Sequence, residues 1–96
     1  MNGEVRAAHN LGCCYRDGEG GPVDLIKAAK YFRLAAEGGY SPGACNFGLA
    51  LLRGHGVAQD LDAAEQWLQR ASEKGHQLAS QELSTLRMYR PYFMRK

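Results

Sequence analysis

His9 and Cys13 are the two side chains whose types and spacing most suggest a chemical site. They lie four positions apart, so on a helix an imidazole and a thiol would share one face, and Cys45 stands 36 positions after His9. A structural zinc site needs four such ligands, and no spacing in the chain supplies the others. Free cysteines are commonly buried as small hydrophobic residues. We therefore expect helix packing here rather than metal binding, and no cofactor.

The common catalytic motifs are missing from the chain. It contains no G-x-x-x-x-G-K-S/T phosphate loop, no H-E-x-x-H or C-x-x-C pair and no G-x-S-x-G turn. The stretch GEGGPV at residues 18–23 is similar to part of a dinucleotide-binding loop, but it lacks the closing glycine and a preceding strand. We therefore predict that the protein is not an enzyme.

The composition favours helices as the elements that position these side chains. Valine, isoleucine and threonine together number five, against thirteen alanines and eleven leucines, and sheets prefer the β-branched types. No apolar run approaches the roughly 18 residues of a membrane span. The first residues do not match a signal peptide, and the three cysteines suit a reducing compartment. We expect an all-α, cytoplasmic protein without a transmembrane segment.

The twelve glycines follow an internal repeat instead of being scattered. Residues 4–39 align with residues 40–75 without a gap and share eleven identical residues, and a partial third copy covers residues 76–90. Each unit is predicted to be a helix, a turn and a second helix. Gly12 and Gly48 fall inside the first helices, where the absence of a side chain allows a neighbouring helix to approach closely.

Capping residues mark the predicted helix boundaries. Asp24 and Asp60 suit the N-cap positions of the second helices. Ser41 and Pro42 suit the cap and the first residue of the next helix. Pro91 is expected to end regular structure, because proline lacks the N–H that a helix uses.

The chain resembles the Sel-1-like repeats, relatives of the tetratricopeptide repeat, in two segments: AAHNLGCCYRDGEGGPVDLIKAAKYFRLAAEGG and GACNFGLALLRGHGVAQDLDAAEQWLQRASEKG. The resemblance implies antiparallel helix–turn–helix repeats stacked as a short right-handed α-solenoid. It implies one domain over residues 1–90, with repeats at about 4–39 and 40–75 and a half repeat at 76–90, followed by a basic tail at 91–96. Leu51 replaces the family's tyrosine, and Ser84 replaces the repeated glycine in the half repeat.

One face of the first helices is the candidate binding site. In tetratricopeptide-like stacks this face lines a concave groove that holds a partner peptide, and the resemblance implies the same role here. An apolar middle rimmed by arginines would suit a peptide with some acidic character. The alternative to partner binding is that residues 91–96 fold back and cover the leucines of this face. The predicted partner-binding residues are Arg6, His9, Cys13, Arg16, Cys45, Leu49, Leu52, Arg53, Gln81 and Thr85.

Positive charge is concentrated at the C-terminal end. Residues 1–86 hold eight basic and ten acidic side chains, whereas residues 87–96 hold four basic ones and no acid. Interleaved tyrosines and a phenylalanine there could touch nucleic acid or an anionic membrane, but basic residues near a helix C-terminus also favour the helix dipole. We interpret this segment as a solvated cap and expect no nucleic-acid partner.

Two functional hypotheses follow from these observations. The first is a non-catalytic adaptor that binds a partner peptide or domain on the concave face of its first helices. The second is a structural terminal fragment of a longer solenoid, which caps an array or self-associates through open repeat ends. About three repeats are usually needed for a stable stack, and this chain carries two and a half.

Overall fold

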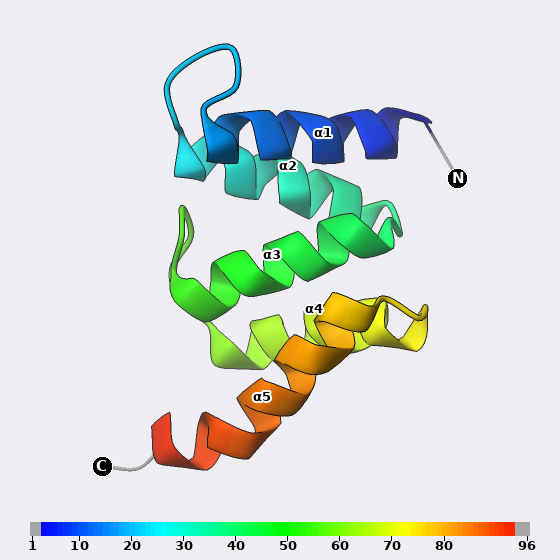
Figure 1. The fold of residues 1–96 in the computed structure, drawn as a ribbon, viewed down its shortest axis with the longest axis vertical. Coiled ribbons are helices and arrows are strands. Elements are labelled where there is room, and N and C mark those ends of the chain that lie inside the picture. The colour runs from blue at the N-terminus through cyan, green and yellow to red at the C-terminus, as the bar shows by residue number, and fades with distance from the viewer. Residues whose placement is uncertain (1–2, 94–96) are drawn as a thin grey trace.

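The computed structural model describes residues 3–93, and within that range it contains five α-helices and no strand. Figure 1 shows the helices succeeding one another along the long axis, each running back along its predecessor, with α1 at one end and α5 at the other. This arrangement confirms the predicted all-α repeat solenoid. The helices are α1 (Gly3–Asp17), α2 (Leu25–Glu37), α3 (Ser41–Arg53), α4 (Leu61–Glu73) and α5 (Gln77–Phe93).

The predicted N-caps hold the two second helices. Asp24 accepts a hydrogen bond from the backbone N–H of Lys27 at 3.0 Å, and Asp60 accepts the equivalent bond from Ala63 at 3.0 Å. Each bond satisfies a backbone donor that has no partner within the helix. Both N-cap predictions are confirmed.

Two predicted boundaries were wrong. Tyr40, not Ser41, is the N-cap of α3, and it caps without a side-chain hydrogen bond, while Pro42 lies within the first turn. Proline is tolerated there because the first-turn N–H groups have no helical acceptor.

Pro91 does not end α5, which continues to Phe93. The missing donor of Pro91 falls in the last turn, and arginines just before it tie α5 to α4. Residues 94–96 of the predicted tail lie outside the described residues.

The mid-helix glycines set the closest helix contacts. A Cβ on Gly12 would lie 2.6 Å from Cδ1 of Phe32 on α2, and a Cβ on Gly48 would lie 2.9 Å from Cγ of Leu68 on α4. Both distances are well inside van der Waals contact. The first and second helix of each repeat therefore approach each other as predicted.

One hydrophobic core runs from α2 to α5. Its buried members are Ala28, Phe32, Ala36, Ala44, Cys45, Phe47, Leu51, Ala64, Leu68, Ala71, Ala79, Leu83 and Leu86. From α1, the partly buried hydrophobic residues Cys13 and Tyr15 pack against this core, and Gly12 and His9 contact its member Phe32. The end helix α1 is thus the least covered element among the described residues.

Gly48→Ala is expected to destabilise the fold despite the higher helix propensity of alanine. The added methyl overlaps Leu68, and overpacking of this kind outweighs a propensity gain of about 1 kcal/mol. We expect the free energy of unfolding, measured by urea denaturation followed by circular dichroism, to fall by about 1–2 kcal/mol. Gly3→Ala is the control, because a Cβ at Gly3 meets nothing within 4 Å. Equal stability of the two variants would contradict the close-contact explanation.

Candidate functional site

Three predicted site residues, Arg16, Leu49 and Arg53, line one small cleft between α1 and α3. We call it the inner cleft; its volume is about 70 Å³. The rest of its wall consists of Leu25, Ala28, Ala29 and Phe32 from α2 with Asn46, Ala50 and His55. The cleft therefore has an apolar floor on α2 and cationic side chains at its edge.

The two arginines of the inner cleft differ in whether their guanidinium groups form an ion pair. Arg16 donates from Nε to Asp17 at 2.9 Å, and its guanidinium lies 5.6 Å from the centroid of the Phe32 ring. The hydrogen bond from Arg16 holds the pKa of the Asp17 carboxyl below its usual value. Arg53 forms no ion pair with any residue in the range 3–93. The inner cleft therefore carries excess positive charge, concentrated at Arg53.

His9 lies where α1, α2 and α3 meet instead of in the inner cleft. Its Nε2 is 3.0 Å from the amide nitrogen of Asn46, and its ring lies edge-on to Tyr40, with 5.2 Å between ring centroids. Phe32 flanks it on another side, 5.8 Å away between centroids. Burial lowers the pKa of His9 below its ordinary value of 6.5, so the neutral imidazole is favoured. His9 joins the two repeats.

The cysteines also belong to helix packing. Sγ of Cys13 lies 3.7 Å from Nε2 of His9. Cys45 is only 1% exposed, and burial raises the pKa of its thiol to about 11. Its side chain is a core residue and not part of an accessible surface. Across residues 3–93, no group of three or more histidine, cysteine or acidic side chains gathers as a metal site would require.

The remaining predicted residues are spread along the stack. Leu49 and Leu52 are half-buried against the core, whereas Arg6, Gln81 and Thr85 are exposed on α1 and α5. The structure thus brings Arg16, Leu49 and Arg53 together and leaves the outer members apart. Partner binding by this face stays a prediction.

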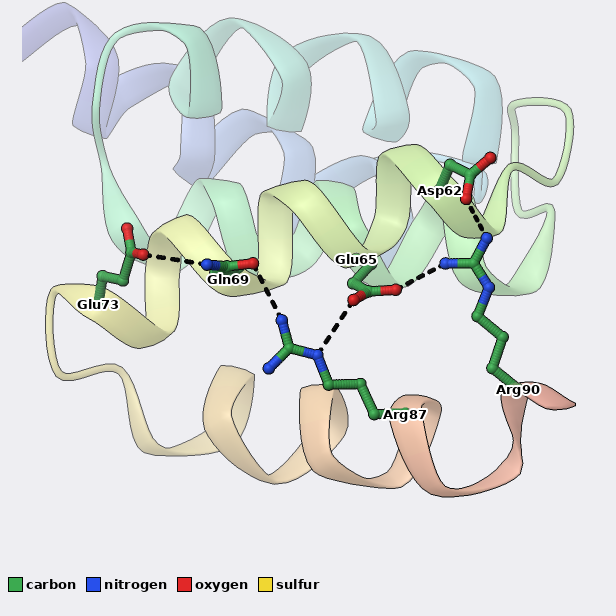
Figure 2. A network of polar contacts seen from close by, with 6 residues as sticks. All are labelled: Asp62, Glu65, Gln69, Glu73, Arg87 and Arg90. Atoms are coloured by element: carbon green, nitrogen blue, oxygen red, sulfur yellow. Dashed lines mark hydrogen bonds and ion pairs between the residues drawn. The ribbon is translucent and has the colours of Figure 1, made fainter.

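Arginines near the C-terminal end form an ionic network with α4, shown in Figure 2. Arg87 donates to Glu65 at 3.0 Å, and Arg90 donates to the other oxygen of Glu65 at 2.6 Å and also pairs with Asp62. A further bond joins Arg87 to Gln69 at 3.0 Å. The bonds from Arg87 and Arg90 lower the pKa of Glu65. These two arginines fasten α5 to α4, so they are not merely solvated charges.

Sequence reasoning missed this network, although the repeat contains a signal for it. Position 87 in the half repeat corresponds to Leu51, and position 65 corresponds to Ala29. Arg87 therefore replaces an apolar residue of α3, and Glu65 replaces an apolar residue of α2. Comparing the two junctions position by position would have paired Arg87 with Glu65.

Comparison with known families decides the identity of the repeat. The Sel1 repeat profile matches residues 5–40 and 42–76. The chain belongs to the Sel1 repeat family. The two matched segments coincide with the two units found from the internal repeat, to within two residues at each boundary.

Solved structures show the same Sel1 arrangement. The chain is 34% identical to a Sel1 repeat protein from Oxalobacter formigenes, with a TM-score of 0.83 over 85% of this chain and 24% of that one. It is 36% identical to c5321, a protective antigen of uropathogenic Escherichia coli with an SLR fold, with a TM-score of 0.83 over 85% of this chain and 18% of that one. This chain therefore spans a quarter or less of either relative. No curated protein gives a significant match.

Membership of the Sel1 family narrows the class of function. Sel1 repeats are in general protein–protein interaction modules, and Sel1 proteins are typically non-catalytic scaffolds. Across residues 3–93, no helix combines the length and hydrophobicity that crossing a bilayer requires.

Acidification is expected to destabilise this Sel1 module through His9. Because burial lowers the pKa of His9, the unfolded chain takes up a proton there at a pH where the folded chain does not. The free energy of unfolding should fall between about pH 7.5 and about pH 5.5, by at most about 1.4 kcal/mol per pH unit. Urea denaturation at several pH values measures this slope. His9→Gln, which keeps a polar group near Asn46, should flatten it, and an unchanged slope in that variant would contradict the assignment.

Proposed function

We propose that this Sel1 module is a non-catalytic adaptor that binds an acidic peptide segment of a partner protein at the inner cleft. The observation that carries the proposal is the combination of an apolar floor on α2 with Arg53 at the edge. The family's general role as an interaction module supports it.

The size of the inner cleft favours a peptide side chain as its occupant. Small-molecule sites usually enclose about 300–1,000 Å³, whereas this cleft measures about 70 Å³. That space accommodates one short aliphatic side chain. Ala28 and Ala29 of its floor are 2% and 1% exposed, so the apolar surface open to such a side chain comes mainly from Leu25, which is 37% exposed, and the half-buried Leu49.

Charge at the edge of the inner cleft favours an acidic neighbour to that aliphatic side chain. Guanidinium groups bind carboxylates through two parallel hydrogen bonds, and Arg53 has no competing ion pair among residues 3–93. Arg16 is paired with Asp17, but both side chains are over 40% exposed, and exposed pairs contribute only about 0–1 kcal/mol. Arg16 can therefore exchange partners at little cost.

The basic residues of α5 do not favour a nucleic-acid partner. Arg87 and Arg90 already pair with Glu65 and Asp62, which reduces the charge available to phosphates.

A structural end unit of a longer array is the second candidate function. It uses the same fold but needs no ligand in the inner cleft.

Selection from a displayed random peptide library tests the adaptor proposal. We expect enrichment of peptides that carry Asp or Glu beside a short aliphatic residue. Arg53→Glu should then weaken a selected peptide by about tenfold, or about 1.4 kcal/mol, as measured by fluorescence anisotropy. Leu49→Asp should weaken it as well, because it places a charge against the apolar wall.

Arg33→Glu is the matched control for charge reversal, because Arg33 is an exposed arginine of α2 outside the inner cleft. Urea denaturation checks that each variant is folded. Selected peptides without acidic residues, or equal losses for Arg33→Glu and Arg53→Glu, would refute the proposal.

A further inference from the structure

Four polar side chains line the inner cleft, and all four can donate hydrogen bonds. Arg16 belongs to the last turn of α1, Asn46 and Arg53 belong to α3, and His55 lies in the loop that follows α3. Among the lining residues, which all fall within 3–93, none is an aspartate or a glutamate. The inner cleft therefore presents several donors without a carboxylate in its own wall to accept from them.

The stack itself does not require these cationic side chains, because the equivalent positions one repeat later lack them. The corresponding pairs are Arg16 with Leu52, Arg53 with Tyr89 and His55 with Pro91. Ala28 of the cleft floor, by contrast, corresponds to Ala64, and both alanines are buried. The apolar floor thus recurs with the repeat, whereas the cations are particular to the junction of α1, α2 and α3. Helix packing does not account for them.

The positive charge of the inner cleft exceeds what one carboxylate neutralises. Arg53 has no ion-pair partner in the described range, and Arg16 is paired only with Asp17, in a pair whose side chains are 42% and 46% exposed. A carboxylate carries one negative charge and fits a single guanidinium through two parallel hydrogen bonds. A phosphorylated serine or threonine carries about −1.5 to −2 charges and has three strong acceptor oxygens, so it can serve both arginines.

We propose that the acidic residue recognised at the inner cleft is a phosphorylated serine or threonine, next to the short aliphatic residue that enters the cleft. This inference rests on the proposed function and specifies the chemistry of its partner. Arg53 and Arg16 bind the phosphate oxygens, and the imidazole N–H of His55 adds a further donor. Phosphorylation of the partner protein thus controls its binding to this module.

The inner cleft favours a phosphopeptide over other molecules that carry phosphate. A nucleic-acid base binds by stacking on an exposed aromatic face, but Phe32 in the cleft is only 3% exposed. Small-molecule sites usually enclose about 300–1,000 Å³, several times the volume of about 70 Å³ found here. The exposed apolar surface of Leu25 needs an aliphatic neighbour, which an adjacent amino acid supplies and inorganic phosphate does not.

Three matched pools of short synthetic peptides test this assignment on the full-length chain. Each pool has a central Val-Z-Val flanked by degenerate positions without cysteine, and Z is phosphoserine, glutamate or serine. Fluorescence anisotropy measures the affinity of each labelled pool. We expect the phosphoserine pool to bind at least about tenfold more tightly than the glutamate pool, equivalent to about 1.4 kcal/mol. The glutamate pool should in turn bind more tightly than the serine pool.

Substitutions copied from the next junction remove the cations while keeping residue types that the repeat accepts. Arg16→Leu and Arg53→Tyr introduce the residues found at the equivalent positions, and urea denaturation checks that both variants are folded. Each variant should lose most of the preference for phosphoserine over glutamate. The matched control is Arg33→Gln, because Arg33 is an exposed arginine outside the inner cleft and corresponds to Gln69. It should keep the preference, and an equal loss in this variant would overturn the proposal.

The comparison of pools separates this inference from the proposed function. Equal binding of the phosphoserine and glutamate pools, both tighter than serine, would overturn the phosphate assignment and leave the acidic-peptide proposal standing. Equal binding of all three pools would overturn both.

Two competitors define the source of the phosphate. Unlabelled phosphoserine peptide should displace the labelled pool at concentrations where inorganic phosphate alone does not. Equal displacement by inorganic phosphate would assign the inner cleft to the free anion. Tighter binding of a single-stranded oligonucleotide that is lost in Arg53→Tyr would assign it to nucleic acid. Either result would overturn the phosphopeptide assignment.

Discussion

The close approach of the two helices within each repeat is the constraint on which the rest of the structure depends. At Gly12 and Gly48 there is no room for a Cβ, because Phe32 and Leu68 occupy that space. Each glycine lowers helix propensity by about 1 kcal/mol relative to alanine, and the buried aromatic or aliphatic side chain opposite offsets that loss by packing. This contact fixes the register of every repeat, and the register then determines which residues face the next unit.

The same register produces two surfaces of different chemistry. Toward the interior of the stack, Leu49 and Arg53 of α3 meet the alanines of α2 without filling the space, and the inner cleft results. On α1, Leu11 repeats a core position but is 44% exposed. The inner cleft is an imperfect junction between two repeats, whereas α1 keeps the residue pattern of a junction. The space in the inner cleft suits a single side chain.

The sequence predicted the features that depend on local backbone chemistry. The repeat register, the N-caps Asp24 and Asp60 and the close contact at Gly48 follow from residue types at fixed spacing. Features that depend on neighbouring elements were harder to predict. Cys45 shares a helical face with exposed residues, yet packing buries it, and the helix continues through Pro91 next to arginines anchored on α4. The angular position of a residue around the helix axis gives the direction of its side chain, but it does not show which element that side chain meets.

The α4–α5 junction shows how one geometry accepts different chemistry. Where the α2–α3 junction has Ala29 and Leu51, this junction has Glu65 and Arg87, and the charges meet at 3.0 Å. The apolar pattern Ala79, Leu83 and Leu86 remains beneath them and is buried. Because exposed ion pairs contribute little stability, the buried pattern accounts for most of the contact, and the ionic rim restricts which helix fits. Junction affinity and junction specificity therefore reside in different residues.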